Sequence, residues 1–359
     1  MTTMNTLSLT AAGGYRPLTR SVMLTTLGLS VAVSFGIFVI LDLGGTTQSF
    51  NIVGAVVVAA VINVVLIYVL SRISEGRRKA TDRLMTGLVT TAFLITLLPL
   101  ISLIFTTVVN GLPRFDLTFF SSSMRNVVGA GGGGLHALMG TLEITGAATL
   151  ISVPVGLLSA IYLVEYGRGR LSQAITFFVD VMTGIPSIVA GLFAFALFAI
   201  FFGPGIRFGI GGAVALSVLM IPVVVRSTEE MLKLVPNELR EASYALGVPK
   251  WLTVVKVVLP TAVGGIITGI MLSISRIIGE TAPLLIIVGM STSMNYDLFS
   301  DRMATLPVFV YTEYANQGAD TQAYLDRAWT GALVLILIVM VLNFGARLLS
   351  RLLSPKGMQ

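Results

Sequence analysis

Two ionisable residues of opposite charge lie four positions apart in a long apolar stretch, and they are the first candidates for chemistry. Arg276 and Glu280 fall in the segment 273–285, where an α-helix would place them on one face and let them pair. Ionisable residues inside membrane spans are costly, so they are functional candidates by default. Arg276 is a permanent cation with a planar donor fork suited to phosphate or carboxylate oxygens. The spacing predicts a point on an anion path, and a static buried ion pair that fixes helix packing is the alternative.

Glycine and proline interrupt the same segment. Gly279 and Pro283 weaken a helix at this point, so we expect a local break whose freed backbone groups line a cavity. Glu280 would then either hold Arg276 in place or exchange partners during transport. One paired arginine would bind an anion only weakly, which suits a conduit supplied by an external binding protein.

A second cluster of polar residues lies in the apolar stretch at 174–202. Thr183 and Ser187 are four residues apart, Pro186 frees a carbonyl in the same turn, and Asp180 lies one turn earlier. A polar, kinked helix face is what a translocation path requires. Packing of hydroxyl groups between helices around a proline kink explains the same residues equally well.

The segment 227–258 is a long polar loop rich in helix formers. Pro236 and Asn237 can start a short helix with acidic residues in its first turn, and Gly247 can end it. A second short helix would run from Lys250 to Pro260. The elbow carries an apolar stripe but is too short to bury that stripe against itself, so we expect a docking surface for a partner protein. A surface helix lying on lipid headgroups is the alternative.

The spacing within this loop resembles the EAA loop of ABC importer permeases. The matching positions, which keep every spacing of that pattern, are Glu241, Ala242, Gly247, Leu259 and Pro260, with Ser243 and Val257 as small departures in volume. In that family the loop fits a cleft on the ATP-hydrolysing subunit. The resemblance therefore implies that this elbow couples the chain to a separate ATPase.

A further resemblance concerns the cargo. The segments Arg276–Pro283, Thr183–Leu192 and Glu165–Gly167 are similar to those of PstA-like permeases of phosphate importers, over about residues 84–355. In that family the arginine of the Arg-x-x-Gly-Glu-Thr segment is implicated in the phosphate path, which here falls on Arg276. A permease for another oxyanion, such as sulfate or molybdate, stays open. An ATP-independent secondary transporter or a membrane sensor is a third alternative, and the docking motif argues against it.

The resemblance also implies an assembly. It comprises a paired PstC-like permease, giving a heterodimer, a dimer of PstB-like ATP-binding subunits and an extracytoplasmic PstS-like phosphate-binding protein. The chain has no Gly-x-x-x-x-Gly-Lys-Ser/Thr segment, so we expect no ATPase site and no bound cofactor of its own. ATP and magnesium would be bound by the partner ATPase.

The amino-acid composition indicates whether the surface of the chain faces water or lipid. Of its 359 residues 55% are hydrophobic and only 11% are charged, and the mean hydropathy is +0.92. Soluble domains carry roughly 25% charged residues, so these values predict a membrane protein. The net charge of +6 suits retention of Lys and Arg on one side of a membrane, and does not require nucleic acid. With no cysteine and one histidine, a thiolate or clustered metal site is excluded.

Apolar stretches predict an all-α polytopic bundle, and the resemblance implies a type I ABC importer core of six helices with two additional N-terminal helices. The expected spans are about 21–41, 52–71, 84–109, 138–163, 174–202, 209–226, 259–290 and 327–350. Placing both termini in the cytoplasm puts most Lys and Arg residues there, as the positive-inside rule requires. We therefore expect a multi-pass protein of a bacterial plasma or inner membrane.

We expect the chain to have two parts. Residues 1–83 should form a cytoplasmic tail and two accessory helices, and residues 84–359 the permease core. The glycine-rich run at 129–134 lacks the strand and the Lys-Ser/Thr pair of a phosphate-binding loop, so we expect a flexible connector.

Overall fold

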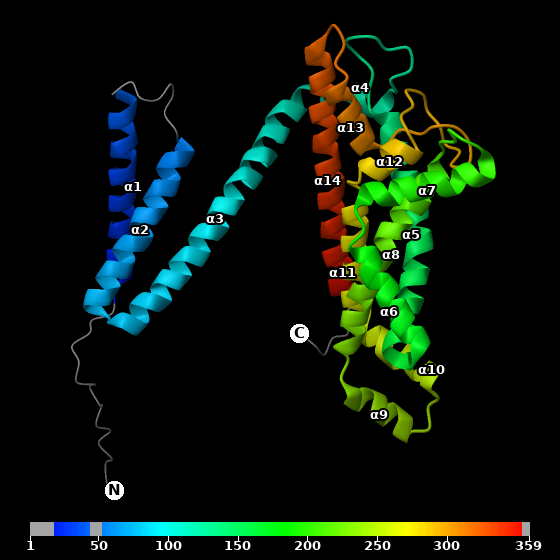
Figure 1. Ribbon diagram of the computed structural model, residues 1–359, viewed down its shortest axis with the longest axis horizontal. Coiled ribbons are helices and arrows are strands. Elements are labelled where there is room, and N and C mark those ends of the chain that lie inside the picture. The colour runs from blue at the N-terminus through cyan, green and yellow to red at the C-terminus, as the bar shows by residue number, and fades with distance from the viewer. Residues whose placement is uncertain (1–17, 44–51, 354–359) are drawn as a thin grey trace. The chain divides into compact units, whose positions relative to one another are not determined.

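The computed structural model describes residues 18–43 and 52–353, and within these ranges it consists of helices joined by turns and loops (Figure 1). The chain divides into two compact units, residues 1–105 and 106–359, and the division falls within helix α3. The helices are α1 Arg20–Leu43, α2 Ile52–Ser74, α3 Arg77–Gly111, α4 Leu117–Ser121, α5 Leu135–Ile161, α6 Arg170–Thr183, α7 Ser187–Phe202, α8 Gly209–Lys233, α9 Asn237–Ala245, α10 Lys250–Thr253, α11 Leu259–Ile277, α12 Ala282–Ile287, α13 Leu306–Ala315 and α14 Thr321–Leu353.

The first unit is a helical hairpin followed by the start of α3. Small residues let α1 and α2 approach closely: Ser34 is buried and donates to the carbonyl of Ala55 at 2.6 Å, and Ala55 is fully buried. Gly76, with φ of 89°, makes the tight turn between α2 and α3. In most other directions the large apolar side chains of these helices are exposed, as expected for surfaces that face lipid.

The second unit is organised around α5 and α8. Gly156 permits their contact, because a Cβ there would lie 2.7 Å from Val224. The buried core around them includes Ile144, Ala148, Leu216 and Met220. Figure 1 shows α9 and α10 at one end of this unit and α4 and α13 toward the other.

Seven helices of the described residues are long and apolar enough to cross a membrane, and α6 with α7 forms an eighth span if that bent pair counts as one. This agrees with the number of spans expected from the sequence. The kink expected in the span 174–202 is a break between two helices, because the chain bends by 110° between Thr183 and Ser187. Gly184 ends α6 and Pro186, which has no N–H to donate, precedes α7.

The expected break in the segment 259–290 is present. Helix α11 ends at Ile277, and α12 restarts at Ala282 with Pro283 in its first turn. Helix α8 continues to Lys233, beyond the expected boundary at 226, because Arg226, Glu229 and Lys233 form bonds three and four residues apart along it.

Candidate translocation path and coupling elbow

The break after α11 separates Arg276 from Glu280. The backbone N–H of Glu280 donates to the carbonyl of Ile277 at 3.1 Å, so the chain is already in a turn where an i,i+4 pairing would need helix. No ion pair joins Arg276 to any acidic residue in the part of the chain that the structure describes. The predicted Arg276–Glu280 pair is therefore absent from this conformation, because the helix break expected from Gly279 removes the geometry that the pair needs.

Arg276 lies on an uncovered face of α11. Its side chain is exposed, as are Gly279 and Leu272, the latter with 60% of its surface accessible. Arg276 lies in the last turn of α11, one residue before the helix ends at Ile277, at the end of a candidate membrane span. An ionisable residue in such a span is costly against lipid, so this face is a candidate for contact with another protein surface or a water-filled cavity.

The structure brings the two interrupted segments together. Helix α7, which starts at Ser187, packs directly on the start of α12, since a Cβ on Gly191 would lie 2.5 Å from the Cα of Pro283. Thr183 is exposed at the bend and donates to the carbonyl of Val179 at 2.8 Å, while Ser187 is half-buried. The Thr183–Ser187 bend and the Gly279–Pro283 break thus belong to adjoining helices.

Asp180 has a different neighbourhood. Its carboxylate pairs with Arg226 of α8, which also binds Glu229 at 2.7 Å, and Lys233 binds the same Glu229 at 2.7 Å. The partners of Asp180 are thus residues of α8 and not the ionisable residues of the α11 break. The structure does not bring Asp180 together with Arg276 and Glu280.

An apolar cavity of about 530 Å³ lies between α5, α11 and α14 in the second unit. It is lined mainly by aliphatic side chains, with the hydroxyl groups of Thr145 and Thr149 among them. No ionisable residue lines it, so it offers no charge to an oxyanion. Arg276 is a better candidate for contact with an anionic cargo.

The segment after α8 forms the expected elbow. Helix α9 ends before Gly247, whose φ of 77° favours glycine, and α10 begins at Lys250. The hydroxyl groups of Ser243 and Thr253 are 2.8 Å apart and buried, and they tie the two short helices together. A π-helical turn at Val254–Val258 then continues into α11. The elbow is therefore joined directly to the helix that carries Arg276.

The elbow presents the residues that sequence reasoning selected. Glu241, Ala242 and Gly247 are exposed, and so is Pro260 at the start of α11, while Leu259 is half-buried against the core. Exposed apolar side chains surround them, including Leu246 at 83% and Trp251 at 61% accessible surface. Such a patch on a charged surface is typical of a protein interaction site.

Sequence reasoning missed the ion pair that holds the elbow in place. Arg240 of α9 donates through Nε and Nη2 to Glu165 at 3.0 and 2.8 Å, and both side chains are largely buried. The same guanidinium donates to the carbonyls of Val235 at 2.6 Å and Leu232 at 3.0 Å. Glu165 lies in the π-helical turn Tyr162–Tyr166 at the end of α5.

A second contact joins the same turn to α10. The ammonium of Lys250 lies 5.0 Å from the centre of the Tyr166 ring, within the range of a cation–π interaction. Both short helices of the elbow are thus attached to one turn of α5. The sequence shows that Glu165, Arg240 and Lys250 lie in polar segments. It does not indicate that Arg240 pairs with Glu165 or that Lys250 contacts Tyr166.

At the other end of the second unit, a buried arginine holds the glycine-rich loop. Arg327 is 1% exposed, pairs with Glu313 at 2.6 Å and donates to the carbonyls of Gly129 at 2.7 Å and Gly131 at 3.2 Å. Burial raises the pKa of Glu313, and Arg327 opposes that shift. Arg327 thus contacts the backbone of this loop at Gly129 and Gly131, and the flexibility expected from the sequence stays a prediction.

Comparison with known proteins agrees with this architecture. The family model described as "Binding-protein-dependent transport system inner membrane component" matches residues 152–357, which include the elbow, α11 and α12. That match spans more than half of the chain. The chain belongs to this family. Its members are inner-membrane permease components of ABC transport systems, and the match begins within α5.

Individual members of the family are also similar over most of the chain. "Phosphate transport system permease protein PstA 1" of Mycobacterium tuberculosis is 47% identical over 278 residues, covering 76% of this chain and 90% of that protein. The protein named PstA of Mycobacterium leprae is 47% identical, covering 75% of this chain and 89% of that protein. The PstA protein of Haemophilus influenzae is 39% identical, and the match covers 76% of this chain and 94% of that protein.

Proposed function

We propose that this chain is the membrane-spanning permease subunit of an ABC importer that moves inorganic phosphate into the cytoplasm. Its relatives, similar over three quarters of the chain, are named phosphate transport permeases. An unpaired arginine on an uncovered face of α11 is the observation that supports phosphate as cargo. An arginine binds tetrahedral oxyanions through its donor fork and keeps its charge at any physiological pH.

The path lies at the uncovered face of α11. A charged side chain is tolerated in a membrane where it faces a partner or a water-filled cavity. Pairing of this chain with a second, PstC-like permease would cover the face around Leu272 and Arg276 and enclose an aqueous route. Thr183, Ser187 and Glu280 would line the same route, while Asp180 would act at its inner end through Arg226.

Energy enters through the elbow. Glu241, Ala242 and Gly247 would contact a PstB-like ATP-binding subunit, which supplies the bound ATP and magnesium, and Leu259 and Pro260 would pass the motion into α11. ATP-driven closure of two such subunits would swing the helices and expose Arg276 to alternate sides. Ser243 and Thr253 support this role by making the elbow one unit.

The external supply is a PstS-like binding protein. A single arginine binds phosphate weakly. Such a site is better suited to receive phosphate from a binding protein than to capture it from dilute solution. With the elbow and both termini in the cytoplasm, the basic residues of the loops follow the positive-inside rule for an inner membrane.

The decisive experiment is ATP-dependent uptake into vesicles that hold the complete complex. Labelled phosphate and labelled sulfate would be compared for the wild type, Arg276→Gln and Arg125→Gln, the last being an exposed arginine in the loop before α5. We expect phosphate uptake in the wild type and in Arg125→Gln, and a loss of at least about tenfold in Arg276→Gln, because a charge-assisted contact contributes about 1.5–3 kcal/mol.

Two results would contradict the proposal. Preferential uptake of sulfate would mean that the cargo is another oxyanion. Unchanged phosphate uptake by Arg276→Gln, with the same amount of complex in the vesicles, would mean that Arg276 is not the contact on the path.

A further inference from the structure

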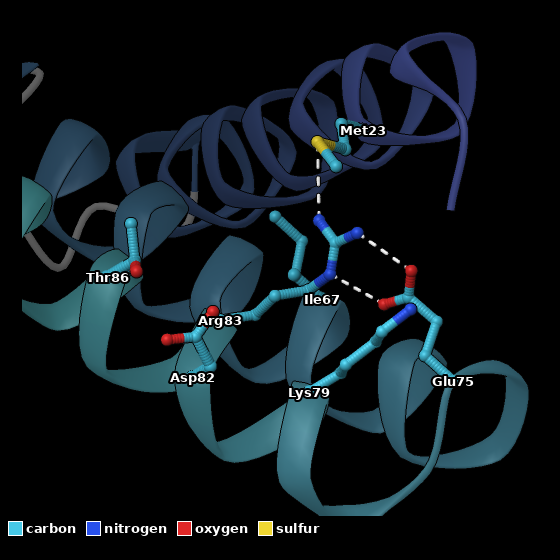
Figure 2. A pocket seen from close by; sticks show the side chains of 8 residues that line it. Met23, Ile67, Glu75, Lys79, Asp82, Arg83 and Thr86 are labelled. Atoms are coloured by element: carbon cyan, nitrogen blue, oxygen red, sulfur yellow. Dashed lines mark hydrogen bonds and ion pairs between the residues drawn. The ribbon is translucent and has the colours of Figure 1, made fainter. Parts of the chain in front are cut away.

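The first unit contains a cavity of about 510 Å³ where its three helices meet (Figure 2). It lies at the ends of these helices that carry charge, next to the apolar spans. Its lining combines apolar residues with a charged rim: Met23, Ile67, Glu75, Lys79, Asp82, Arg83, Thr86 and Gly87. The proposed transport function uses none of these residues.

The acidic residue on the cavity floor is already satisfied. Glu75 accepts from Arg83 Nε at 2.6 Å and Nη2 at 2.8 Å, from the hydroxyl of Ser71 at 2.7 Å and from the N–H of Leu18 at 2.7 Å. The hydrogen bonds from Arg83 are the main reason that the pKa of Glu75 falls to about 2. Glu75 therefore remains ionised and has little capacity for another donor.

Two cationic groups at this cavity retain donors. The recorded acceptor of Arg83 Nη1 is the sulfur of Met23 at 3.7 Å, and a thioether is a weak acceptor (Figure 2). Lys79 is exposed and has no hydrogen bond or ion pair among residues 18–43 and 52–353. These donors can bind a phosphate group without displacing any strong bond in the structure.

The surroundings favour a lipid as the source of that phosphate. The segment 72–83 is net positive, with basic residues at positions 72, 77, 78, 79 and 83 and acidic residues at positions 75 and 82. Basic clusters at the end of a membrane span attract anionic groups of lipid headgroups at the membrane surface. Ile67 and Gly87 provide an apolar side for an acyl chain, whereas Asp82 would repel a free phosphate dianion and accept an ammonium group.

We infer that this cavity binds a membrane phospholipid, with its phosphate on Lys79 and the free edge of Arg83 and its acyl chains along Ile67 and Met23. An ethanolamine headgroup fits the full lining, because its ammonium can reach Asp82 while its phosphate contacts the two cations. The site would anchor the hairpin α1–α2 to one leaflet. This inference does not depend on which cargo the permease carries.

The test measures how lipid stabilises the full-length chain in detergent. The thermal unfolding midpoint is followed during titration with dioctanoyl-phosphatidylethanolamine, with dioctanoylglycerol, which lacks the phosphate, and with inorganic phosphate. We expect the phospholipid to raise the midpoint of the wild type in a saturable manner. Neither of the other two compounds should produce that rise.

Variants assign the effect to the cavity. Lys79→Gln should abolish most of the rise and Lys79→Arg should restore it. Thr86→Phe, which fills the cavity without changing charge, should also abolish it. Arg78→Gln is the matched control, because Arg78 is exposed, has no ion pair among the described residues and does not line the cavity.

The inference is overturned by any of three results. One is an equal rise in Lys79→Gln and Arg78→Gln, which would indicate general attraction to the basic segment. Another is an equal rise with inorganic phosphate, which would make the ligand a free anion. The third is an equal rise with dioctanoylglycerol, which would leave the phosphate without a role.

Discussion

Arg327 and Arg276 show how differently one side chain behaves according to its neighbours. Arg327 is almost completely buried, and Glu313 and two carbonyl groups satisfy most of its donors. Arg276 is exposed and unpaired within the described part of the chain, although Glu280 lies only four positions away. The first arrangement suits a structural role, and the second is consistent with the contact to cargo that we propose for Arg276.

This contrast predicts different effects on stability. Glu313→Gln should lower the free energy of unfolding by about 3–5 kcal/mol, because it leaves Arg327 as a buried charge without its partner. Glu280→Gln should change it by less than about 1 kcal/mol, because it breaks no ion pair here. Thermal unfolding of both variants in the same detergent would check the order, and a larger effect of Glu280→Gln would mean that the pair forms in the stable state.

The low pKa of Glu75 predicts that the stability of the folded chain depends on pH only under acidic conditions. Its pKa is about 2 in the folded chain against 4.5 for a free carboxyl group, chiefly because of Arg83. A depressed pKa contributes stability that is fully present above pH 4.5 and is lost as the pH falls toward 2. Between pH 5 and pH 3 the unfolding midpoint of the wild type should therefore fall more than that of Glu75→Gln. Parallel curves for the two proteins would contradict this origin.

Among the elements, the elbow depends on contacts as much as on its sequence. Helices α9 and α10 are too short to be stable by themselves. The Ser243–Thr253 bond joins them, and Glu165 and Tyr166 attach them to the end of α5. We therefore expect motion of the elbow to reach α5 as well as α11.

Loss of the Glu165–Arg240 pair should uncouple transport from hydrolysis. In the complete complex, Arg240→Gln should retain ATP hydrolysis within about threefold but transport several-fold less phosphate per ATP, because the elbow would move without carrying α5. The double variant Glu165→Arg, Arg240→Glu should recover part of the ratio. Arg168→Gln, an exposed arginine near the same turn, is the control. A proportional fall of both activities in Arg240→Gln would indicate simple misfolding.

Gly247 should tolerate asparagine better than alanine. A Cβ at this position meets no atom within 4 Å, so the only cost comes from its φ of 77°. That backbone costs an ordinary residue about 1–2 kcal/mol, and asparagine less. Uptake by Gly247→Ala should be weaker than by Gly247→Asn in complexes formed at limiting ATPase concentration. The reverse order would show that contact with the partner, and not backbone strain, determines the choice of glycine.

At the scale of the whole molecule, the chain divides into two compact units, residues 1–105 and 106–359. The family model matches residues 152–357, which lie within the second unit. Within the second unit one face of α11 around Arg276 is exposed, and an arginine that faces lipid is costly. Permeases of this family act together with other transporter subunits. The molecule described here is therefore a part of a larger assembly.

Thiol labelling can test that conclusion, because the natural sequence has no cysteine. Leu272→Cys should react with a membrane-permeant maleimide in the isolated chain and be protected at least about fivefold once the paired permease is bound. Val128→Cys, at a position that is 93% exposed in a loop, should react in both states when the binding protein is absent. Equal reactivity of Leu272→Cys in both states would place the partner on another face.

Local and compositional rules account for what the sequence could predict. The length of the apolar stretches predicted the spans, and Gly279 and Pro283 predicted the break after α11. Pro236, Asn237 and Gly247 predicted the elbow. Each of these depends on residues close together in the chain. In the fifth expected span, Pro186 predicted a kink, but the sequence could not give the 110° angle between α6 and α7.

Tertiary structure decided which charges pair. Arg240 binds Glu165 from 75 positions away, and Arg327 binds the Gly129 carbonyl from 198 positions away. Nothing in the spacing of the sequence specifies such partners, since many acidic groups compete and only packing brings one of them within reach. The nearest candidate, Glu280, is excluded from Arg276 by the turn between them. The sequence by itself thus placed a cation, Arg276, in a long apolar stretch, and the fold leaves that cation without an ion pair among the described residues because the helix breaks before Glu280.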